Sequence, residues 1–499
     1  MLTVAEIKKL IDDDASSKKK QLAKKGQAYY EGNHDIKAYR IFYFNRDGKL
    51  VEDKTRNNAK LPHPFFTELV DQAVQYILSG EKGFVRSDDP ALQDEMDSYF
   101  NENEEFLAEL TEVLTGGQTK GFEYMYAYMG EEGKTAFQCA DSIGVVEVEA
   151  RFASDSKDHV LYWYVDRIDK DGKKIKHIMD WDATQVVLYT QKDNGEVELD
   201  KGAKPNPKPH ILYKEEGKET LFYDEFGFIP FFRFDNNKKQ RSNLHPIKDL
   251  IDDYDLHASS LTNNLVDFDT PIYAVRGFDG DDEHLEELGV NLKSRKVIGT
   301  PEEGSLEVHT VEVPYQARKE KLELDEKNIY RFGMGLNISG LKDTAATTNI
   351  AIKAAYSLLE LRCSKMEINL KRFMRKIIKV VLAEINKANG TDYQQKDVYF
   401  VFDHEIMSNA QENAGIKLTE AQTRQMEITT LLNLAAQLDN ETLMQLICEQ
   451  LDIEWEEIKD KLPDPDEAEN EVANAQNGLN GVVVEDEQTA EGSSAAVLG

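Results

Sequence analysis

The amino-acid sequence predicts an α+β protein organised on long helices, and two observations lead to this prediction. Residues 349–389 carry apolar side chains at a spacing of three to four, with neither proline nor glycine before Gly390. This pattern is typical of one long helix with a single buried face. Residues 121–234 instead contain short runs of Tyr, Val, Ile and Phe between glycine-containing turns, which is typical of antiparallel hairpins.

Charge and composition narrow the function. The chain has 499 residues and a formal net charge of −33. A free-standing module that binds DNA is expected to be basic, so this charge argues against simple duplex binding. It leaves open a protein that lets nucleic acid pass without holding it. No apolar run reaches about 18 residues, so we expect no membrane span. The three cysteines lie far apart and match no metal-binding spacing, so we expect no disulfide framework.

The first 120 residues are expected to be mainly helical. The lysine-rich segment 17–25 is interpreted as a solvated helix face; the alternative, a nucleic-acid site, requires its cations to cluster on one surface. The other expected elements are a hairpin over 41–51 that turns at Asp47 and Gly48, a helix over 61–78, and helices over 90–102 and 104–115 that are broken by Gly116 and Gly117.

Two further helices flank an insert of different character. They are expected over 242–268 and 316–333, and residues 269–315 between them read as a small α/β unit. This insert is too small to bury a large core of its own, so we expect it to pack on something else. A break rich in Gly and Thr, residues 334–348, separates the second helix from the long one.

The remainder of the chain is expected to be one strand, several helices and a tail. The strand, over 397–402, is expected to rejoin the earlier sheet. Thr419 starts a capping-box pattern and is expected to open a helix. Residues 463–499 contain acidic residues but no Lys or Arg, and this composition predicts disorder.

The sequence offers little support for catalysis. Neither glycine-rich segment, 115–121 or 333–340, ends in Gly-Lys-Ser/Thr or has the GxGxxG spacing, and the ten histidines show no HExxH pattern. Asp180 and Asp182 flank Trp181 and are expected to face solvent. We therefore predict no catalytic residue, no cofactor, no metal site and no enzyme activity.

The long helix is unusually basic for so acidic a chain, with nine Lys or Arg and three Glu. The favoured interpretation is that these cations pair with acidic partners on neighbouring helices or subunits. The alternative is a basic belt near a nucleic-acid path, where Lys and Arg contact phosphates without reading sequence. The cations are Lys353, Arg362, Lys365, Lys371, Arg372, Arg375, Lys376, Lys379 and Lys387.

Three segments, in their order along the chain, carry a resemblance to a known family. They are residues 29–36 (YYEGNHDI), 57–65 (NNAKLPHPF) and 328–337 (NIYRFGMGLN). With these segments and the order of elements above, the chain resembles the portal proteins of tailed double-stranded DNA bacteriophages, in the class found in siphophages of Gram-positive hosts. The likeness spans residues 25–460.

The resemblance implies a portal fold with a wing, a stem, a clip and a helical crown. It assigns the wing to 1–241, the long helix 349–390 and the return strand 391–416; the stem to helices 242–268 and 316–333; the clip to 269–315; a tunnel loop to 334–348; the crown to 417–462; and a disordered acidic tail to 463–499.

The resemblance also implies a function and partners. Such portals form a ring, expected to be a dodecamer, at one capsid vertex. The terminase large subunit packages double-stranded DNA through the ring without regard to sequence, and the genome later exits into the tail. The other implied partners are the major capsid and scaffolding proteins and a head–tail adaptor, with assembly in the host cytoplasm. The alternatives are another virion structural or head–tail adaptor protein without a DNA channel, and a nucleic-acid enzyme with a dispersed site.

Site residues follow from this resemblance. Lys342 is the one cation in 334–348 and is expected to face the channel, with weaker polar contacts from Asn337, Thr347, Thr348 and Asn349. Glycines 333, 335 and 340 are expected to let this loop change conformation. An acidic stem lining that repels DNA is expected from Asp249, Asp252, Asp253 and Asp255. In the clip, Lys293, Arg295 and Lys296 are expected at the channel exit or at a subunit contact.

Overall fold

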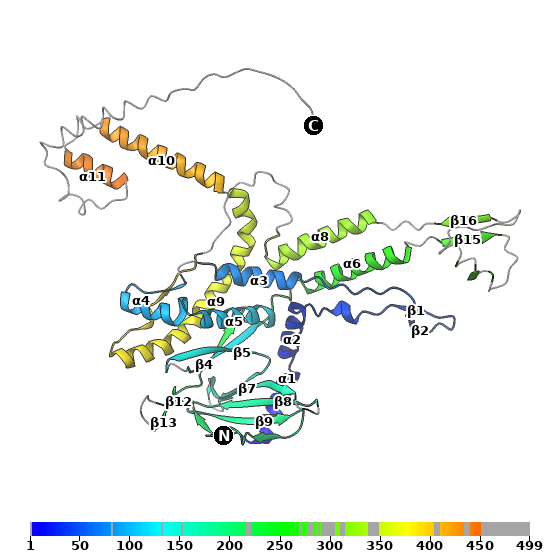
Figure 1. The fold of residues 1–499 in the computed structure, drawn as a ribbon, viewed down its shortest axis with the longest axis horizontal. Helices are drawn as coiled ribbons and strands as arrows, with labels where there is room; N and C mark the ends of the chain where they lie inside the picture. The colour runs from blue at the N-terminus through cyan, green and yellow to red at the C-terminus, as the bar shows by residue number, and fades with distance from the viewer. Residues whose placement is uncertain are drawn as a thin grey trace, which may run out of the picture. The chain divides into compact units, whose positions relative to one another are not determined.

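The computed structural model describes residues 2–80, 83–130, 133–150, 153–168, 170, 172–214, 221–268, 272–276, 284, 286–287, 290, 305–309, 315–337, 349–403, 410–433 and 440–450. The chain divides into two units, Met1–Met407 and Ser408–Gly499. Helices and strands are both abundant (Figure 1), so the predicted α+β class is confirmed.

Helices α1 (Val4–Ser16) and α2 (Lys18–Tyr30) open the first unit. The side chain of Thr3 accepts from Glu6 N and forms a capping box at the start of α1. Ser17 plays the corresponding capping role for α2. Helix α1 packs Ile7 and Ile11 into an apolar cluster with residues of the largest sheet.

The lysine-rich segment is not simply a solvated face. Lys20 is buried, and its ammonium donates to the backbone carbonyls of Ser142 and Val145, the latter at 2.6 Å. The ammonium of Lys19 lies 3.8 Å from the centroid of the Phe122 ring. A buried lysine is tolerated when its donors all find acceptors. The prediction is therefore wrong for these two lysines.

The predicted hairpin and the helix after it are confirmed. Strands β1 (Phe42–Phe44) and β2 (Leu50–Glu52) pair antiparallel, and α3 (Phe65–Ile77) follows. Strand β3 (Val85–Arg86) precedes α4 (Pro90–Met96), which continues into a π-helical turn over Asp97–Asn101.

Helix α5 (Glu104–Lys120) runs through the two glycines that were expected to interrupt it. It stops instead at Gly121, which has the left-handed φ of 97°. A Cβ on Gly116 would lie 1.9 Å from Oε2 of Glu123, and one on Gly117 would lie 2.5 Å from the Phe234 ring. The glycines therefore allow strands to approach the helix closely, and the prediction of a break is wrong.

The expected meander of antiparallel strands is confirmed. The largest sheet has the order β10-β9-β8-β7-β6 with β11 beside β9; a second has the order β14-β4-β5; and β12 pairs with β13. The strands are β4 (Phe122–Met129), β5 (Thr135–Ala140), β6 (Val145–Ala150), β7 (Ala153–Ile168), β8 (Lys174–Trp181), β9 (Gln185–Lys192), β10 (Val197–Leu199), β11 (Lys208–Pro209), β12 (Ile211–Lys214), β13 (Leu221–Asp224) and β14 (Phe231–Asp235).

Asp180, on β8, differs from the prediction. It is buried, and its Oδ1 lies 2.7 Å from Nδ1 of His159. The expectation that it faces solvent is therefore wrong, because Asp180 points to the covered face of the sheet and finds a histidine there.

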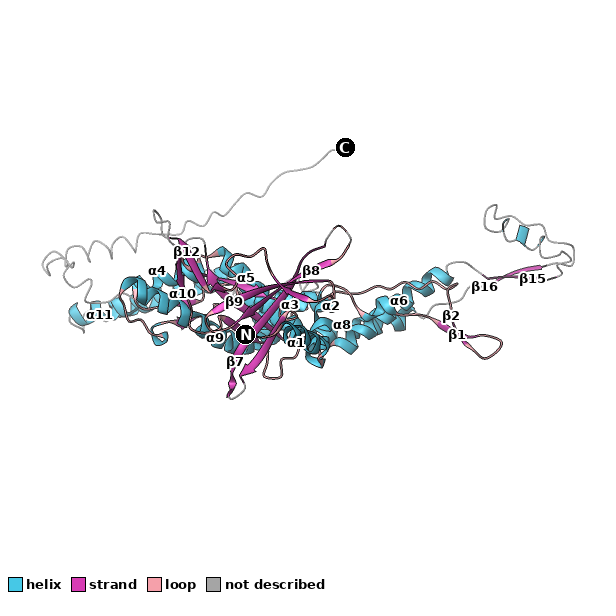
Figure 2. Cartoon of the chain, turned by 90° about the horizontal axis from the view of Figure 1, so that it is seen from below, coloured by secondary structure: helices cyan, strands magenta, loops and turns pink. Residues whose placement is uncertain are grey.

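Helices α6 (Lys248–Phe268) and α8 (Tyr315–Gly333) lie side by side (Figures 1 and 2). Both expected helices are present, although α6 begins at Lys248 and not at residue 242. Between them in the sequence, β15 (Ile272–Arg276) pairs antiparallel with β16 (Ser305–His309). The predicted helix of this insert lies mostly outside the described residues.

The long helix α9 (Asn349–Asn389) is 41 residues long, and its predicted buried face is confirmed. It packs chiefly against α3, β14 and the segments around them. Its buried apolar residues include Leu359, Met366, Leu370, Phe373, Ile377, Val381 and Ile385.

The elements after α9 differ from two expectations. Strand β17 (Tyr399–Phe400) pairs with β3 rather than with the meander. In the second unit, α10 (Ala410–Asn433) begins before Thr419, so that residue is inside the helix and does not open it. Helix α11 (Asn440–Gln450) follows, and the tail lies outside the described residues. Among the helices that the structure describes, none has the length and hydropathy needed to cross a membrane.

Candidate functional site

The acidic residues of α6 mostly face partners within the chain. Asp249 is exposed. Asp252 accepts from the hydroxyl of Tyr29 and from Lys248 Nζ, the latter at 2.5 Å. Lys248 also lies 2.8 Å from Asp35, and with Lys25 it outweighs the effect of burial and lowers the pKa of Asp35 to about 2.

Asp253 joins α6 to α8. Its Oδ2 lies 2.5 Å from the ammonium of Lys321, which also pairs with the buried Asp325 of its own helix. His257 lies one turn further along α6, 3.4 Å from Asp253. Lys321 of α8 therefore neutralises part of the acidic charge of α6.

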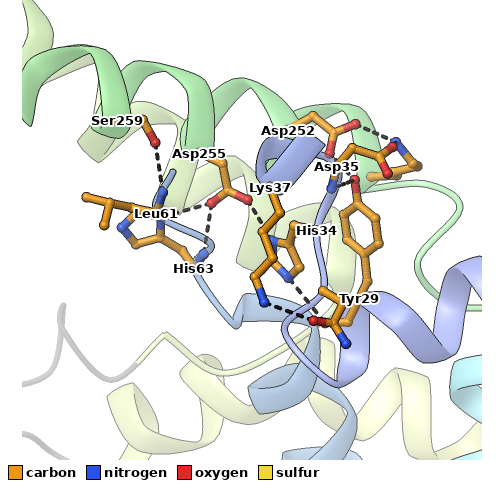
Figure 3. A network of polar contacts seen from close by, with 11 residues as sticks. Tyr29, His34, Asp35, Lys37, Leu61, His63, Asp252, Asp255 and Ser259 are labelled. Atoms are coloured by element: carbon orange, nitrogen blue, oxygen red, sulfur yellow. Dashed lines mark hydrogen bonds and ion pairs between the residues drawn. The ribbon is translucent and has the colours of Figure 1, made fainter. Parts of the chain in front are cut away.

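Asp255 corrects the sequence prediction. Its side chain is fully buried, so it does not belong to an exposed acidic lining. Oδ2 lies 2.6 Å from Nδ1 of His34 and Oδ1 lies 2.8 Å from Nδ1 of His63 (Figure 3). Burial alone would raise the pKa of Asp255, but the hydrogen bonds with the two histidines lower it.

Residues 59–63 bind α6 through three hydrogen bonds that repeat at a regular spacing. Alternate backbone N–H groups donate to side chains four residues apart on the helix. The pairs are Ala59 N to Asn263 Oδ1 (2.7 Å), Leu61 N to Ser259 Oγ (3.0 Å) and His63 N to Asp255 Oδ1 (2.9 Å). Two extended residues advance by about 6.6 Å and four helical residues by about 6 Å, so the two periods match. Pro62 and Pro64 favour the extended backbone that this register needs.

The segment after α8 is clamped on α3. Gln72 accepts from Leu336 N through Oε1 and donates to Leu336 O through Nε2, both at 3.0 Å. Leu336 then joins a buried cluster with Ala73 and Tyr76 of α3 and Tyr356 of α9. Leu336, after α8, and Tyr356, about two turns into α9, therefore meet on α3.

Gly333 and Gly335 lack a side chain, and this allows the backbone to pack closely against Leu69 of α3. An added Cβ would come within 2.6 Å and 2.0 Å, respectively, of the buried side chain of Leu69. The prediction that these two glycines give the loop conformational freedom is replaced by a packing role. Gly340 lies outside the described residues.

Arg362 belongs to the interior and not to a basic belt. Its guanidinium donates to the backbone carbonyls of Leu69 at 2.9 Å and Gly333 at 3.2 Å, and to the side chain of Gln118. Burial lowers the pKa of Arg362 to about 10. The residue thus connects α9 with α3, α5 and the end of α8.

Other cations of α9 also find partners within the chain. Lys387 lies 2.9 Å from Asp224, and Lys371 lies 3.8 Å from Glu367. Arg375 donates to Gln395 O at 3.1 Å. These partners lie on α9 itself, on β13 and on the backbone near Gln395, and not on neighbouring helices, so the favoured interpretation stays a prediction; Lys353, Lys365 and Lys379 are exposed.

Few of the expected channel residues are described. Nδ2 of Asn337 donates to Glu326 Oε1 at 3.4 Å, and Asn349 is the first residue of α9. Lys342, Thr347 and Thr348 of the loop, and Lys293, Arg295 and Lys296 of the insert, lie outside the described residues. Across the described part of the chain, no group of three or more His, Cys, Asp or Glu is arranged to hold a metal ion.

Sequence reasoning did not identify the residues that fix this site: His34, His63, Gln72 and Arg362. The run of alternate prolines beside His63, and the spacing of four between Asp255, Ser259 and Asn263, were available signals. Gln72 and Arg362 sit in ordinary helical patterns and gave no comparable signal.

Comparison with known proteins places most of the chain in one family. Residues 8–462 match the family model described as phage portal protein, SPP1 Gp6-like. A portal protein of Bacillus phage SPP1 is 26% identical over 359 residues, which cover 70% of this chain and 67% of that protein. A portal protein of Clostridium phage phiCD119 is 26% identical over 439 residues, which cover 83% and 89%, respectively.

Proposed function

The chain belongs to the SPP1 Gp6-like family of phage portal proteins, and from this premise we propose how its parts divide the work of a DNA channel. Portal proteins are virion proteins of the capsid that form oligomeric rings, through which the genome is packaged and later ejected. The proposal concerns which residues of this chain face the DNA, how many copies form the ring, and which proteins meet it.

The clamp on α3 is the observation that supports a loop role for residues 334–348, whose first residues it holds. Gln72 and the cluster around Leu336 hold the chain before the loop, and Tyr356, about two turns into α9, enters the same cluster. A loop closed at a rigid base can be presented to a moving duplex while the surrounding helices keep their positions. Lys342 would follow the phosphate backbone from this loop, with Asn337, Thr347, Thr348 and Asn349 as polar contacts.

The stem helices α6 and α8 would form the channel wall below this loop. Asp249 is exposed, and Asp252 and Asp253 keep part of their surface despite their lysine partners. Carboxylates on such a wall would repel phosphates and keep the duplex centred, whereas a row of cations would hold it by salt-dependent contacts. Asp255 takes no part in this lining, because it is buried.

The ring is proposed to be a dodecamer assembled in the host cytoplasm and built into one capsid vertex. Residues 269–315 would form the clip that meets the terminase large subunit and later the head–tail adaptor. Lys293, Arg295 and Lys296 would lie at the channel exit or between subunits. The major capsid and scaffolding proteins would contact the outer parts of the ring. The protein would supply no catalysis, because the terminase drives packaging.

A packaging assay tests the loop assignment. Proheads built with a Lys342→Ala portal are expected to package or retain several-fold less DNA, because a contact with the moving backbone is lost. The matched control is Lys9→Ala, which removes an exposed lysine from α1, outside the proposed channel wall. Equal packaging by wild type, variant and control would show that Lys342 does not act on the DNA.

A further inference from the structure

The hairpin β1–β2 exposes several large apolar side chains to water. Phe42 is 50% exposed, Phe44 72% and Leu50 59%. A two-stranded hairpin is at best marginally stable by itself in water. Contiguous exposed apolar surface of this kind marks an interaction site. We name residues 42–52 the arm.

The register of the arm places its most exposed residues on one face. Phe42 pairs with Glu52, and Phe44 pairs with Leu50, so Phe42, Phe44 and Leu50 share a face. Tyr43 and Val51 pair on the other face and are less exposed as a pair, at 49% and 38%. Covering the first face would therefore remove more apolar surface from water than covering the second.

The turn and the base of the arm are fixed by its own hydrogen bonds before any partner arrives. Asn45 Oδ1 accepts from Asp47 N at 3.0 Å and from Lys49 N at 2.9 Å, which fixes the turn. At the base, Asp53 N donates to Ile41 O at 2.8 Å. After the arm, residues 59–63 are hydrogen-bonded to α6. A preorganised arm loses little conformational freedom when it docks, which favours binding.

The copy number of a ring favours a neighbouring copy as the partner that covers the arm. Every copy of the chain presents one arm, so an assembled ring presents as many apolar arms as it has subunits. A partner that binds the ring in smaller number would leave arms exposed and prone to aggregation. A neighbouring copy has the same number by definition, and a ring joins two different surfaces of successive copies.

We propose that the arm is an intersubunit contact, whose Phe42, Phe44 and Leu50 face packs on the next copy of this chain in the ring. The proposal rests on the ring formation stated under the proposed function, and it adds which residues hold the ring together. The packing removes the exposed aromatic and aliphatic surface from water, and this surface supplies the driving force.

A triple variant tests the arm. Phe42→Ser, Phe44→Ser and Leu50→Ser together are expected to raise the protein concentration needed for half assembly at least roughly hundredfold, because three apolar side chains no longer leave water. These side chains are exposed in the single chain, so far-UV circular dichroism and the thermal unfolding of the subunit should stay unchanged. The matched control is Arg46→Ser, which alters an exposed position in the turn and leaves the apolar face intact.

Two measurements decide the outcome. Analytical ultracentrifugation should show rings for wild type and control and small species for the triple variant; rings of unchanged stability in the triple variant would overturn the arm assignment and leave the proposed function standing. A benzoylphenylalanine at position 44 should crosslink to a second copy, and a crosslink confined to its own copy would also overturn it. Absence of rings in the wild type would instead remove the proposed function together with the arm.

Discussion

Nδ1 of His34 lies 2.6 Å from Oδ2 of Asp255, although 221 positions separate the two residues in the chain. Both side chains are fully buried. The contact fixes the segment after α2 to the middle of α6, and the second carboxylate oxygen fixes His63 in the same way. One carboxylate therefore joins two segments of the N-terminal region to the proposed channel wall, beside the contacts of Tyr29 with Asp252 and of Asp35 with Lys248.

Loss of that carboxylate should be costly. Asp255→Ala leaves the buried His34 and both the ring and the N–H of the partly exposed His63 without their acceptor, so we expect a loss of about 2–4 kcal/mol of unfolding free energy. Urea denaturation followed by circular dichroism measures it. Asp249→Ala, at an exposed position on the same helix, is the control and should change stability by less than about 0.5 kcal/mol. Equal midpoints for the two variants would contradict the role given to Asp255.

The same carboxylate predicts a pH dependence. The pKa of Asp255 is lowered in the folded chain, so its contribution to stability is complete above the ordinary Asp pKa of about 4 and disappears as the pH falls through the folded value. The stability difference between wild type and Asp255→Asn should therefore shrink between pH 5 and pH 3. Denaturation midpoints across this range measure the difference, and a difference that stays constant down to pH 3 would count against the lowered pKa.

The glycine at the loop's base gives a prediction about packing. Gly335→Ala places a methyl group against the buried Leu69 and should destabilise the protein by about 1–3 kcal/mol. Leu69→Ala opens space for that methyl, so the double variant should lose less stability than the two single losses added together. A double-mutant cycle by urea denaturation measures the coupling. Strict additivity would contradict the packing role given to Gly335.

Local patterns made much of the fold predictable. The buried face of α9 repeats at the period of a helix, and the hairpin around Asp47 and Gly48 carries its own turn signal. Both features are set by neighbours in the sequence. Gly116 and Gly117 show where the same reasoning fails, because a local rule for ending helices cannot register that Phe234 and Glu123 pack against this point.

The site was less predictable because distant segments build it. Composition suggested an acidic face on α6, but whether Asp255 is exposed depends on His34 and His63, which come from a different part of the chain. Likewise, Lys20 and Arg362 look like surface cations in their helices, and only the carbonyls brought to them by other elements make burial possible. Long-range partners of this kind leave no periodic trace in a single sequence.

Electron microscopy of the purified full-length protein in negative stain tests the central claim most directly. We expect closed rings of uniform symmetry with a central hole, twelve subunits in each, because the chain is a portal protein whose stem helices are proposed to line a DNA channel. A homogeneous population of monomers without rings, even at high protein concentration, would contradict the account.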